Sequence, residues 1–294
     1  MESMEKAVPL IECKCECGEA PLWLPQADSL LWVDTEKPVC FSCKPGAEGF
    51  NRHDVIGPFQ AIAPRAEGGY IAPLIDKVAL VDNELGITED LGNPVQEKAH
   101  LLIGDGTAGP DGCYYFTTYD CKDLYSTEGG IFRVNTDRSI VQVLGKLSLP
   151  NGIAFNISGS KLYITEMFRN RIVSYDFNIS SGSFSNRSVF KDVPQEAGLP
   201  DGLIIDSEGC LWSAHWQGFR VTRYTPEGNI DRVIEVPVPT PTCMAFGGPE
   251  MTTLYITTAK KGLSNQQLSD YPDSGNLFVI ETGIRGREEL PFRG

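Results

Sequence analysis

The sequence is poor in histidine and in positive charge. It contains 3 His, and 25 Lys and Arg stand against 39 Asp and Glu, which gives a formal net charge of -14. A nucleic-acid partner requires a basic surface, so this balance argues against one. No stretch approaches the roughly 18 consecutive apolar residues that span a bilayer, so no membrane partner is expected. The scarcity of histidine and the lack of a Gly-x-Ser-x-Gly elbow leave a Ser-His-Asp hydrolase without support.

The first residues also lack a secretory signal. Met1 to Pro9 shows no basic segment followed by an apolar one. The chain has 9 Cys, an odd number, and without a signal this favours reduced thiols over disulfides. We therefore expect a cytoplasmic protein, present as a monomer or a weak homo-oligomer.

Five of the cysteines lie close together in the sequence: Cys13, Cys15 and Cys17 alternate, and Cys40 and Cys43 form a C-x-x-C pair. Such spacing is compatible with a thiolate zinc site. However, three alternating residues spread their sulfurs along roughly 13 Å of strand at about 3.3 Å per residue, too far for one tetrahedral ion. We therefore favour buried packing, in which Cys acts as a small apolar side chain.

Long helical periodicity is missing as well, whereas turn residues are abundant. The chain has 30 Gly and 20 Pro, several in pairs such as Gly68-Gly69 and Gly129-Gly130, which predicts many turns and short strands. When the turn glycines and apolar runs are aligned, six similar units appear, at residues 19–46, 59–86, 104–137, 151–178, 201–228 and 242–283.

The period of these units, about 40 to 50 residues, is typical of propeller blades with four strands each. We therefore predict an all-β fold, a six-bladed β-propeller that forms one domain over residues 1–294. The alternative, a β-sandwich, does not explain why the turn glycine follows the head residue by 8 positions in two units (Asn151 to Gly159 and Asp201 to Gly209). We expect residues 284–294 to close the last blade, helped by an N-terminal strand around residues 11–17, within residues 1–18.

The head of each unit predicts a metal site. Two units begin with the related phrases Pro150-Asn151-Gly152 and Pro200-Asp201-Gly202. If each innermost strand begins at its head residue, the heads form a ring at one mouth of the axis: Glu19, Gln60, Gly104, Asn151, Asp201 and Thr242. Carboxylate and amide oxygens suit hard cations such as Ca²⁺ and Mg²⁺. Asn-Gly and Asp-Gly are also ordinary turn dipeptides, but three oxygen ligands at one position of a ring favour a metal.

Motifs along nearly the whole chain, in a specific order, resemble the gluconolactonase/regucalcin (senescence marker protein) family, including bacterial sugar lactonases. They are Gly18-Glu19-Ala20-Pro21-Leu22-Trp23, Leu31-Trp32-Val33-Asp34, Pro150-Asn151-Gly152, Pro200-Asp201-Gly202, Trp216-Gln217-Gly218, Cys243-Met244-Ala245-Phe246-Gly247-Gly248-Pro249 and the run from Leu254 to Ser264.

The resemblance implies a six-bladed propeller that binds one divalent metal cation, Ca²⁺, Zn²⁺, Mn²⁺ or Fe²⁺. It implies Glu19, Asn151 and Asp201 as the metal ligands, with Asp201 also the general base, and hydrolysis of a small-molecule lactone by activated water. Two other kinds of function remain open. One is a different metal-dependent reaction, either hydrolysis of another ester or phosphoester or an isomerisation. The other is a non-catalytic, Ca²⁺-binding regulatory propeller.

The third unit departs from the family pattern. Where the family has Arg-x-Asn-Asp-Gly, this chain has Leu102-Ile103-Gly104-Asp105-Gly106, and Thr117-Thr118-Tyr119 and Lys122 follow. We expect Leu102, Gly104, Asp105, Tyr119 and Lys122 to contact substrate. Loss of the guanidinium and amide predicts a less polar or larger lactone or ester. The alternative is a sugar lactone held by other residues, among them Lys122, Asp120, Asp123, His100 and His215.

Two further residues follow the second strand of their units. Glu166 and His215 both stand where a strand end meets the predicted pocket. We expect both to bind substrate there. The alternatives are an inter-blade hydrogen bond for Glu166 and a backbone contact for His215.

Overall fold

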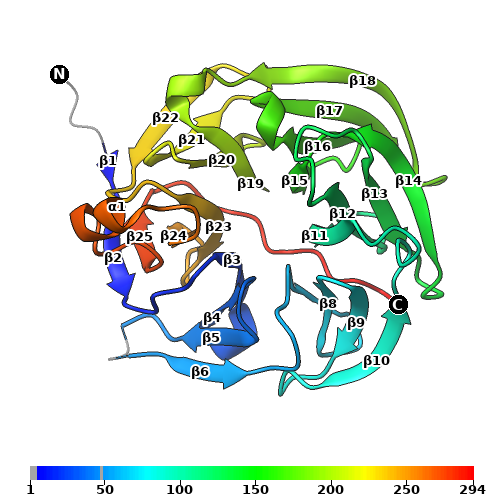
Figure 1. The fold of residues 1–294 in the computed structure, drawn as a ribbon, viewed down its shortest axis with the longest axis horizontal. Coiled ribbons are helices and arrows are strands. Elements are labelled where there is room, and N and C mark those ends of the chain that lie inside the picture. The colour runs from blue at the N-terminus through cyan, green and yellow to red at the C-terminus, as the bar shows by residue number, and fades with distance from the viewer. Residues whose placement is uncertain (1–4, 47–48) are drawn as a thin grey trace.

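Strands dominate the computed structural model, which describes residues 5–46 and 49–294. They form six sheets arranged in a ring about one axis (Figure 1), so the predicted six-bladed β-propeller is confirmed. Apart from the strands that the N-terminus adds at the outside of two blades, each sheet is an antiparallel meander in chain order from the axis outward. The blades follow one another around the ring in sequence order, and each predicted unit falls on one sheet.

The first three blades contain four strands each, from the inside outward. Their strands are β3 (Gly18–Leu24), β4 (Ser29–Asp34), β5 (Val39–Cys43) and β6 (Asn51–Asp54); β7 (Ala63–Pro64), β8 (Tyr70–Leu74), β9 (Lys77–Val81) and β10 (Ile87–Gly92); and β11 (Leu101–Ala108), β12 (Tyr114–Asp120), β13 (Gly129–Val134) and β14 (Ile140–Leu147).

The last three blades follow the same order, and the N-terminus adds one strand at the outside of the fifth and one at the outside of the sixth. Their strands are β15 (Pro150–Phe155), β16 (Lys161–Glu166), β17 (Arg171–Asn178) and β18 (Ser183–Asp192); β19 (Leu199–Ile205), β20 (Leu211–Trp216), β21 (Arg220–Tyr224), β22 (Ile230–Glu235) and β1 (Glu5–Lys6); and β23 (Pro241–Gly247), β24 (Thr253–Thr258), β25 (Leu277–Glu281) and β2 (Val8–Ile11).

Within the described residues, helix is confined to short segments: α1 (Asn265–Asp270) and three 3-10 turns at Pro25–Ala27, Met167–Arg169 and Gln195–Ala197. In the described part of the chain, none of the helices has the length and apolar character to cross a membrane.

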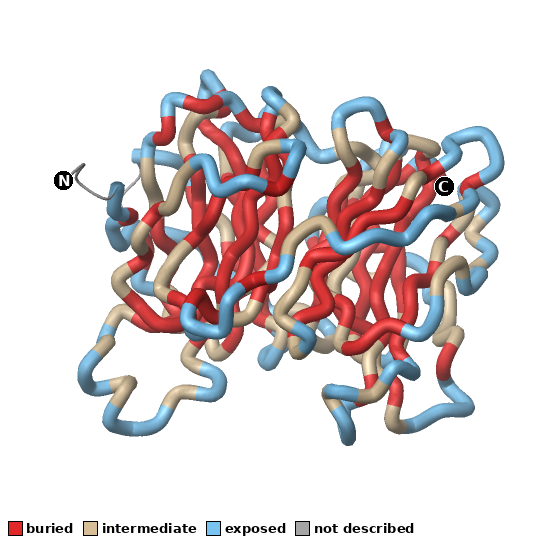
Figure 2. Tube along the Cα trace, turned by 90° about the horizontal axis from the view of Figure 1, so that it is seen from above, coloured by how far each residue is buried: buried red, intermediate tan, exposed pale blue. Residues whose placement is uncertain are grey.

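Burial falls from the middle of each blade to its edge. The second strands, such as β4, β16 and β24, are buried at nearly every position, because both of their faces pack against neighbouring blades. The outermost strands β6, β10 and β18 are mostly exposed and polar. Figure 2 shows the same contrast between buried strands and exposed loops at the two faces. Trp32 and Trp212 are 0% exposed and lie in one apolar cluster between blades, which is where the hydrophobic effect places large aromatic rings.

The closure of the ring differs from the prediction at the C-terminus. Residues 284–294 do not add a strand to the sixth blade. They form a strap that crosses one face of the ring (Figure 1). The N–H of Ser207 donates to the Arg285 carbonyl at 2.9 Å, and the N–H of Phe292 donates to the Pro64 carbonyl at 2.9 Å. The reason is that β2 already occupies the free edge of β25, with Ile11 paired to Leu277.

Five of the six inner strands share an irregularity at the head of the blade. Their pairing with the second strand slips by bulging at residues 19–22, 103–106, 151–153, 200–203 and 241–244. A bulge bends its strand and redirects the side chain at that point. The same bulge therefore recurs in these blades, and it directs the head residue of each toward one mouth of the axis.

Candidate functional site

A cavity of about 270 Å³ lies at the mouth where the inner strands begin. Five of the six head residues line it, each from a different blade: Glu19, Gln60, Gly104, Asn151 and Asp201. Asp105, which follows Gly104 in the bulge of β11, lines it as well. The repeat therefore brings together two acids and two amides from the heads, and one further acid, in a single cavity.

Thr242 and Gln60, two of the heads, serve the architecture. The Thr242 hydroxyl is fully buried and donates to the Gly18 carbonyl at 2.5 Å, which ties blade six to blade one. The Gln60 amide donates to the Thr35 carbonyl at 3.1 Å, which ties blade two to blade one. Thr242 does not line the cavity, whereas Gln60 lines it and uses only its amide nitrogen in the contact with blade one.

The three predicted metal ligands are held by close contacts. Asp201 is 2% exposed, and its Oδ1 accepts a hydrogen bond from the Asn151 side-chain amide. Glu19 Oε2 accepts from the N–H of Ala20 at 3.1 Å. Ala20 has a left-handed φ of 44°, a strained conformation for a residue with a side chain, and it lies within the bulge of β3. These contacts fix carboxylate and amide oxygens side by side in the cavity.

The electrostatics of the cavity disfavour three negative charges. Burial raises the pKa of Glu19 well above its usual value, and the charges of Asp201 and Asp105 raise it further. The pKa of Asp201 is raised by burial and by Asp105. Burial also raises the pKa of Asp105 to about 7, although the N–H of Gly106 partly opposes the shift. Such a cluster is stabilised by protons or by a cation.

Of the other residues predicted to contact substrate, Gly104, Asp105 and Tyr119 line the cavity. Leu102 and Lys122 do not. Leu102 lies two residues nearer the start of β11 than Gly104, which places it about 6–7 Å further out along the strand. Lys122 is exposed in the turn after β12, where its N–H donates to Asp120 Oδ1 at 2.9 Å.

Glu166 also lies outside the cavity lining, contrary to the prediction. Its carboxylate is 2% exposed and forms ion pairs with two arginines of its own blade, Arg171 at 2.7 Å and Arg187 at 2.6 Å. These ion pairs hold the Glu166 carboxylate against the outer strands of its own blade, so it is not available to a substrate.

His215 is likewise placed away from the cavity lining. It is fully buried in β20, and neither ring nitrogen has a hydrogen-bond partner among the described residues. Burial lowers its pKa to about 3, and the charge of Arg220 contributes. The imidazole is therefore neutral at physiological pH and does not serve as an acid in the cavity.

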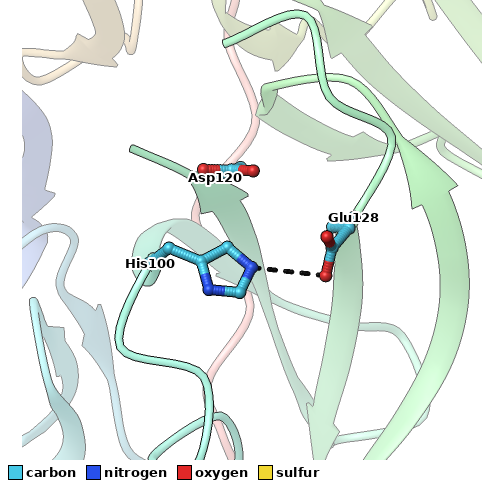
Figure 3. A group of neighbouring side chains, drawn as sticks. All are labelled: His100, Asp120 and Glu128. Carbon is cyan, nitrogen blue, oxygen red and sulfur yellow. Dashed lines mark hydrogen bonds and ion pairs between the residues drawn. The ribbon is translucent and has the colours of Figure 1, made fainter. Parts of the chain in front are cut away.

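A second group of possible metal ligands lies outside the cavity lining (Figure 3). His100, Asp120 and Glu128 offer ligand atoms within 4.8 Å of one another. His100 Nε2 is 3.3 Å from Glu128 Oε2, and the Lys98 ammonium is 3.3 Å from the same oxygen. Asp120 accepts the N–H groups of the turn that follows it. The lysine and the backbone thus already satisfy this group, whereas among the described residues no cation pairs with Glu19, Asp105 or Asp201, and Lys261 of the cavity lining pairs with Glu36.

Sequence reasoning missed most of the apolar lining. It comes from turns and strand ends that carry no period, and includes Leu124, Leu149, Met167, Phe168, Leu199 and Trp216. It also missed Thr117 on β12 and the ion pair between Lys261 and Glu36, whose charged atoms are 2.5 Å apart. Trp216 and Lys261 lie in motifs that carried the family resemblance, so the motifs gave a signal for these two.

The sequence model of the SMP-30/Gluconolactonase/LRE-like region matches residues 17–260. The chain belongs to this family. Regucalcin from Oryctolagus cuniculus is 28% identical over 294 residues, which cover 97% of this chain and 98% of that protein. Regucalcin from Bos taurus is 29% identical over 295 residues, with the same coverage. The family resemblance found in the sequence is thereby confirmed.

Solved structures of other proteins have the same fold. A calcium-binding regucalcin from Agrobacterium tumefaciens superimposes with a TM-score of 0.92 at 23% identity, over 100% of both chains. A luciferin-regenerating enzyme gives a TM-score of 0.89 at 24% identity, over 98% of this chain and all of that one. A gluconolactonase from Xanthomonas campestris gives 0.73 at 20% identity, over 94% and 89%. Membership of this family is consistent with a hydrolase of the lactonase type.

Proposed function

We propose that this protein is a divalent-cation-dependent lactonase. The observation that carries the proposal is the convergence of Glu19, Asn151 and Asp201 in one axial cavity. Family membership supports it, as does the likeness in fold to a gluconolactonase. Calcium binding, which is stated of the Agrobacterium regucalcin, is proposed here for the same three residues.

The residues fit a cation on two grounds. All three offer oxygen, the ligand type of Ca²⁺ and of other divalent ions that bind carboxylates. The acids are also buried beside a third, Asp105, and both burial and the neighbouring carboxylates raise their pKa values. When bound, such a cation polarises an ester carbonyl and makes bound water more acidic.

Asp201 is the residue proposed to move the proton. Its carboxylate takes a proton from the water that attacks the lactone carbonyl carbon, and passes it to the ring oxygen as the C–O bond breaks. The product is a hydroxy acid, whose ionisation releases one proton to solvent. Asn151 holds Asp201 Oδ1 through its amide N–H, which fixes the direction of the carboxylate.

The test compares Asp201→Asn with a matched control from the other acidic group, Glu128→Gln. Acid release from a panel of lactones is followed in a pH-stat with Ca²⁺, Mn²⁺, Zn²⁺ or Fe²⁺ added. We expect Asp201→Asn to lower kcat by about 10²–10⁴-fold while the protein stays folded, because it removes the proton acceptor. Glu128→Gln should leave turnover unchanged.

Acid release that survives in Asp201→Asn would contradict the proposal. A fall in turnover in Glu128→Gln would instead move the metal to the His100 group. If no lactone releases acid but Ca²⁺ still raises the melting temperature in an Asp201-dependent way, the protein is a Ca²⁺-binding propeller and not a lactonase.

A further inference from the structure

A patch without a side chain lies in the wall of the axial cavity at Gly104. A β-carbon at this position would lie 2.7 Å from Thr117 Oγ1 and 3.5 Å from Tyr119 Cδ1. All three residues line the cavity. In the bulge of β11, Gly104 and Asp105 together face Thr117 on β12, since Ile103 pairs with Thr118 and Gly106 with Phe116. The glycine thus leaves bare backbone beside a hydroxyl and an aromatic ring.

The Thr117 hydroxyl is buried without a partner. Thr117 is 0% exposed, and its Oγ1 has no hydrogen bond within residues 5–46 and 49–294. A buried hydroxyl left unpaired costs about 1–3 kcal/mol. Thr117 borders the cavity, although its hydroxyl is covered by neighbouring side chains. A ligand whose acceptor oxygen displaces these neighbours and reaches the hydroxyl recovers that cost.

The lining also has a large apolar and aromatic part, beside the polar and charged residues. Tyr119, Leu124, Leu149, Met167, Phe168 and Trp216 all face the cavity. The Tyr125 ring meets the Phe168 ring edge-on at 5.3 Å between centroids, which supports Phe168 from behind. A substrate rich in hydroxyl groups would lose hydrogen bonds to water against such a wall, whereas an apolar ring gains from it.

The charges of the cavity disfavour an anionic substrate. Its lining holds four carboxylates and one ammonium: Glu19, Glu36, Asp105, Asp201 and Lys261. Lys261 is already paired with Glu36. Even one divalent cation would leave this set with no net positive charge, so a neutral ligand suits the cavity better than an acidic one.

We propose that the substrate is a neutral lactone with an aryl or similarly flat apolar group, which packs over Gly104 against Tyr119. An acceptor oxygen of the same molecule takes a hydrogen bond from the Thr117 hydroxyl. This inference names the substrate class of the proposed lactonase and rests on that function. Thr117 and Gly104 are its specificity determinants.

The first test compares two substrates and two valine variants. Metal-loaded protein is assayed with dihydrocoumarin, a neutral aryl lactone, and with D-glucono-δ-lactone. We expect kcat/KM to be at least about tenfold higher for dihydrocoumarin. Thr117→Val should raise KM for it about tenfold, the effect of one lost hydrogen bond to a buried group.

The matched control is Thr118→Val. The Thr118 hydroxyl is also buried without a partner in the described chain, but Thr118 does not line the cavity. Neighbouring strand residues point to opposite faces of the sheet. Thr118→Val should therefore leave KM unchanged. Equal effects of the two variants would overturn the role of Thr117.

The second test fills the patch. Gly104→Ala should raise KM for dihydrocoumarin more than for the smaller δ-valerolactone. The added methyl would lie 2.7 Å from Thr117 Oγ1, so it must either displace that hydroxyl or enter the place of the aryl group. Gly145→Ala in β14 of the same blade is the control. The nearest atom to its added β-carbon is the flexible Gln142 Nε2, at 3.2 Å. A Gly104→Ala effect that is the same for both lactones would overturn the proposed subsite.

A binding assay separates this inference from the proposed lactonase. The lactam 3,4-dihydroquinolin-2-one has the shape of dihydrocoumarin but resists hydrolysis, and its binding is measured by calorimetry. Preference for gluconolactone would overturn the substrate class and leave the lactonase. Thr117-dependent lactam binding without acid release from any lactone would overturn the lactonase and keep the ligand class. Neither binding nor turnover would overturn both.

Discussion

At the scale of single residues, His215 makes stability depend on pH. Its ring is fully buried, lacks hydrogen-bond partners among the described residues and has a pKa lowered to about 3. In the unfolded chain the pKa of histidine is about 6.5. Between these two pKa values the unfolded state therefore binds a proton at His215 and the folded state does not. The stability contributed by neutral His215 is complete above pH 6.5 and is lost as the pH falls toward 3.

We predict that His215→Gln flattens this dependence. Between pH 6.5 and pH 5 the wild-type protein should lose about 2 kcal/mol through His215, at 1.36 kcal/mol per pH unit. The variant should lose correspondingly less, whatever its stability at pH 7. Thermal unfolding followed by circular dichroism at several pH values measures both slopes.

His53→Gln is the control for this experiment. His53 lies on the outermost strand β6, and one of its ring nitrogens is 2.9 Å from the Ser42 hydroxyl. Its removal should leave the slope between pH 5 and 7 as in the wild type. If His215→Gln and the wild type lose stability in parallel, the imidazole is not held neutral in the fold.

At the scale of strands, the sequence predicts the blades because each repeats one local pattern. An apolar inner strand and an apolar second strand recur in every unit, and a turn glycine lies between them in all units except the first. Packing between blades buries these strands in the same way. The ends of the chain do not follow this pattern. The pairing of β2 with β25 joins residues more than 260 positions apart, and only Ile11 of β2 is buried. Such a strand carries little local signal.

The residues of the candidate site likewise differ in whether the repeat predicts their position. Head residues such as Glu19, Asn151 and Asp201 could be placed in the cavity from the repeat alone, since the bulge acts at the same point of each blade. Glu166 and His215 could not, because strand position does not reveal whether an arginine captures a carboxylate or a neighbouring blade buries a ring. Turns such as that at Met167–Arg169 also contribute lining, without any period to predict it.

A truncation that removes residues 1–11 tests the role of β2. It deletes β1 and β2 and leaves the N–H and C=O groups along one edge of β25 unpaired. Free edge strands pair with other chains. We expect a lower melting temperature together with concentration-dependent association, measured by light scattering after gel filtration.

The point variant Ile11→Ala separates packing from edge protection. Ile11 is 8% exposed within the apolar cluster that joins blades one, five and six. The variant should lower the melting temperature, by a cost of about 2–5 kcal/mol, without causing association, because the strand remains. A truncated protein that stays monomeric with an unchanged melting temperature would show that β2 does not close the ring.

At the scale of the whole molecule, the two mouths of the axis differ. The heads of the inner strands form the candidate site at one mouth. At the other, the C-terminal strap lies over the ends of the same strands, and Arg287 and Glu289 line a second cavity with Phe155 and Phe246. Phe292 of the strap is fully buried among blades two and three. The strap thus links distant blades and covers the face away from the candidate site. The mouth at which the inner strands begin stays open to substrate.

The axial acids also couple the stability of the whole ring to pH and to metal. The pKa values of Glu19 and Asp201 are raised, and that of Asp105 is about 7. Without a cation, the folded state therefore holds protons that the unfolded state has already lost above pH 4–5. This contribution favours folding at acidic pH and is lost as the pH rises through 7. A cation that replaces these protons binds more tightly as the pH rises.

We predict that Ca²⁺ raises the melting temperature more at pH 8 than at pH 5. At 100 times its Kd, a ligand specific for the folded state adds about 2.7 kcal/mol, which corresponds to a shift of several degrees for a chain of this size. Scanning calorimetry with Ca²⁺ or with a chelator at the two pH values measures the shift. Asp201→Asn should reduce it and Glu128→Gln should retain it, because only the first removes an axial ligand. An equal shift at both pH values, or one lost in Glu128→Gln, would place the cation away from the axis.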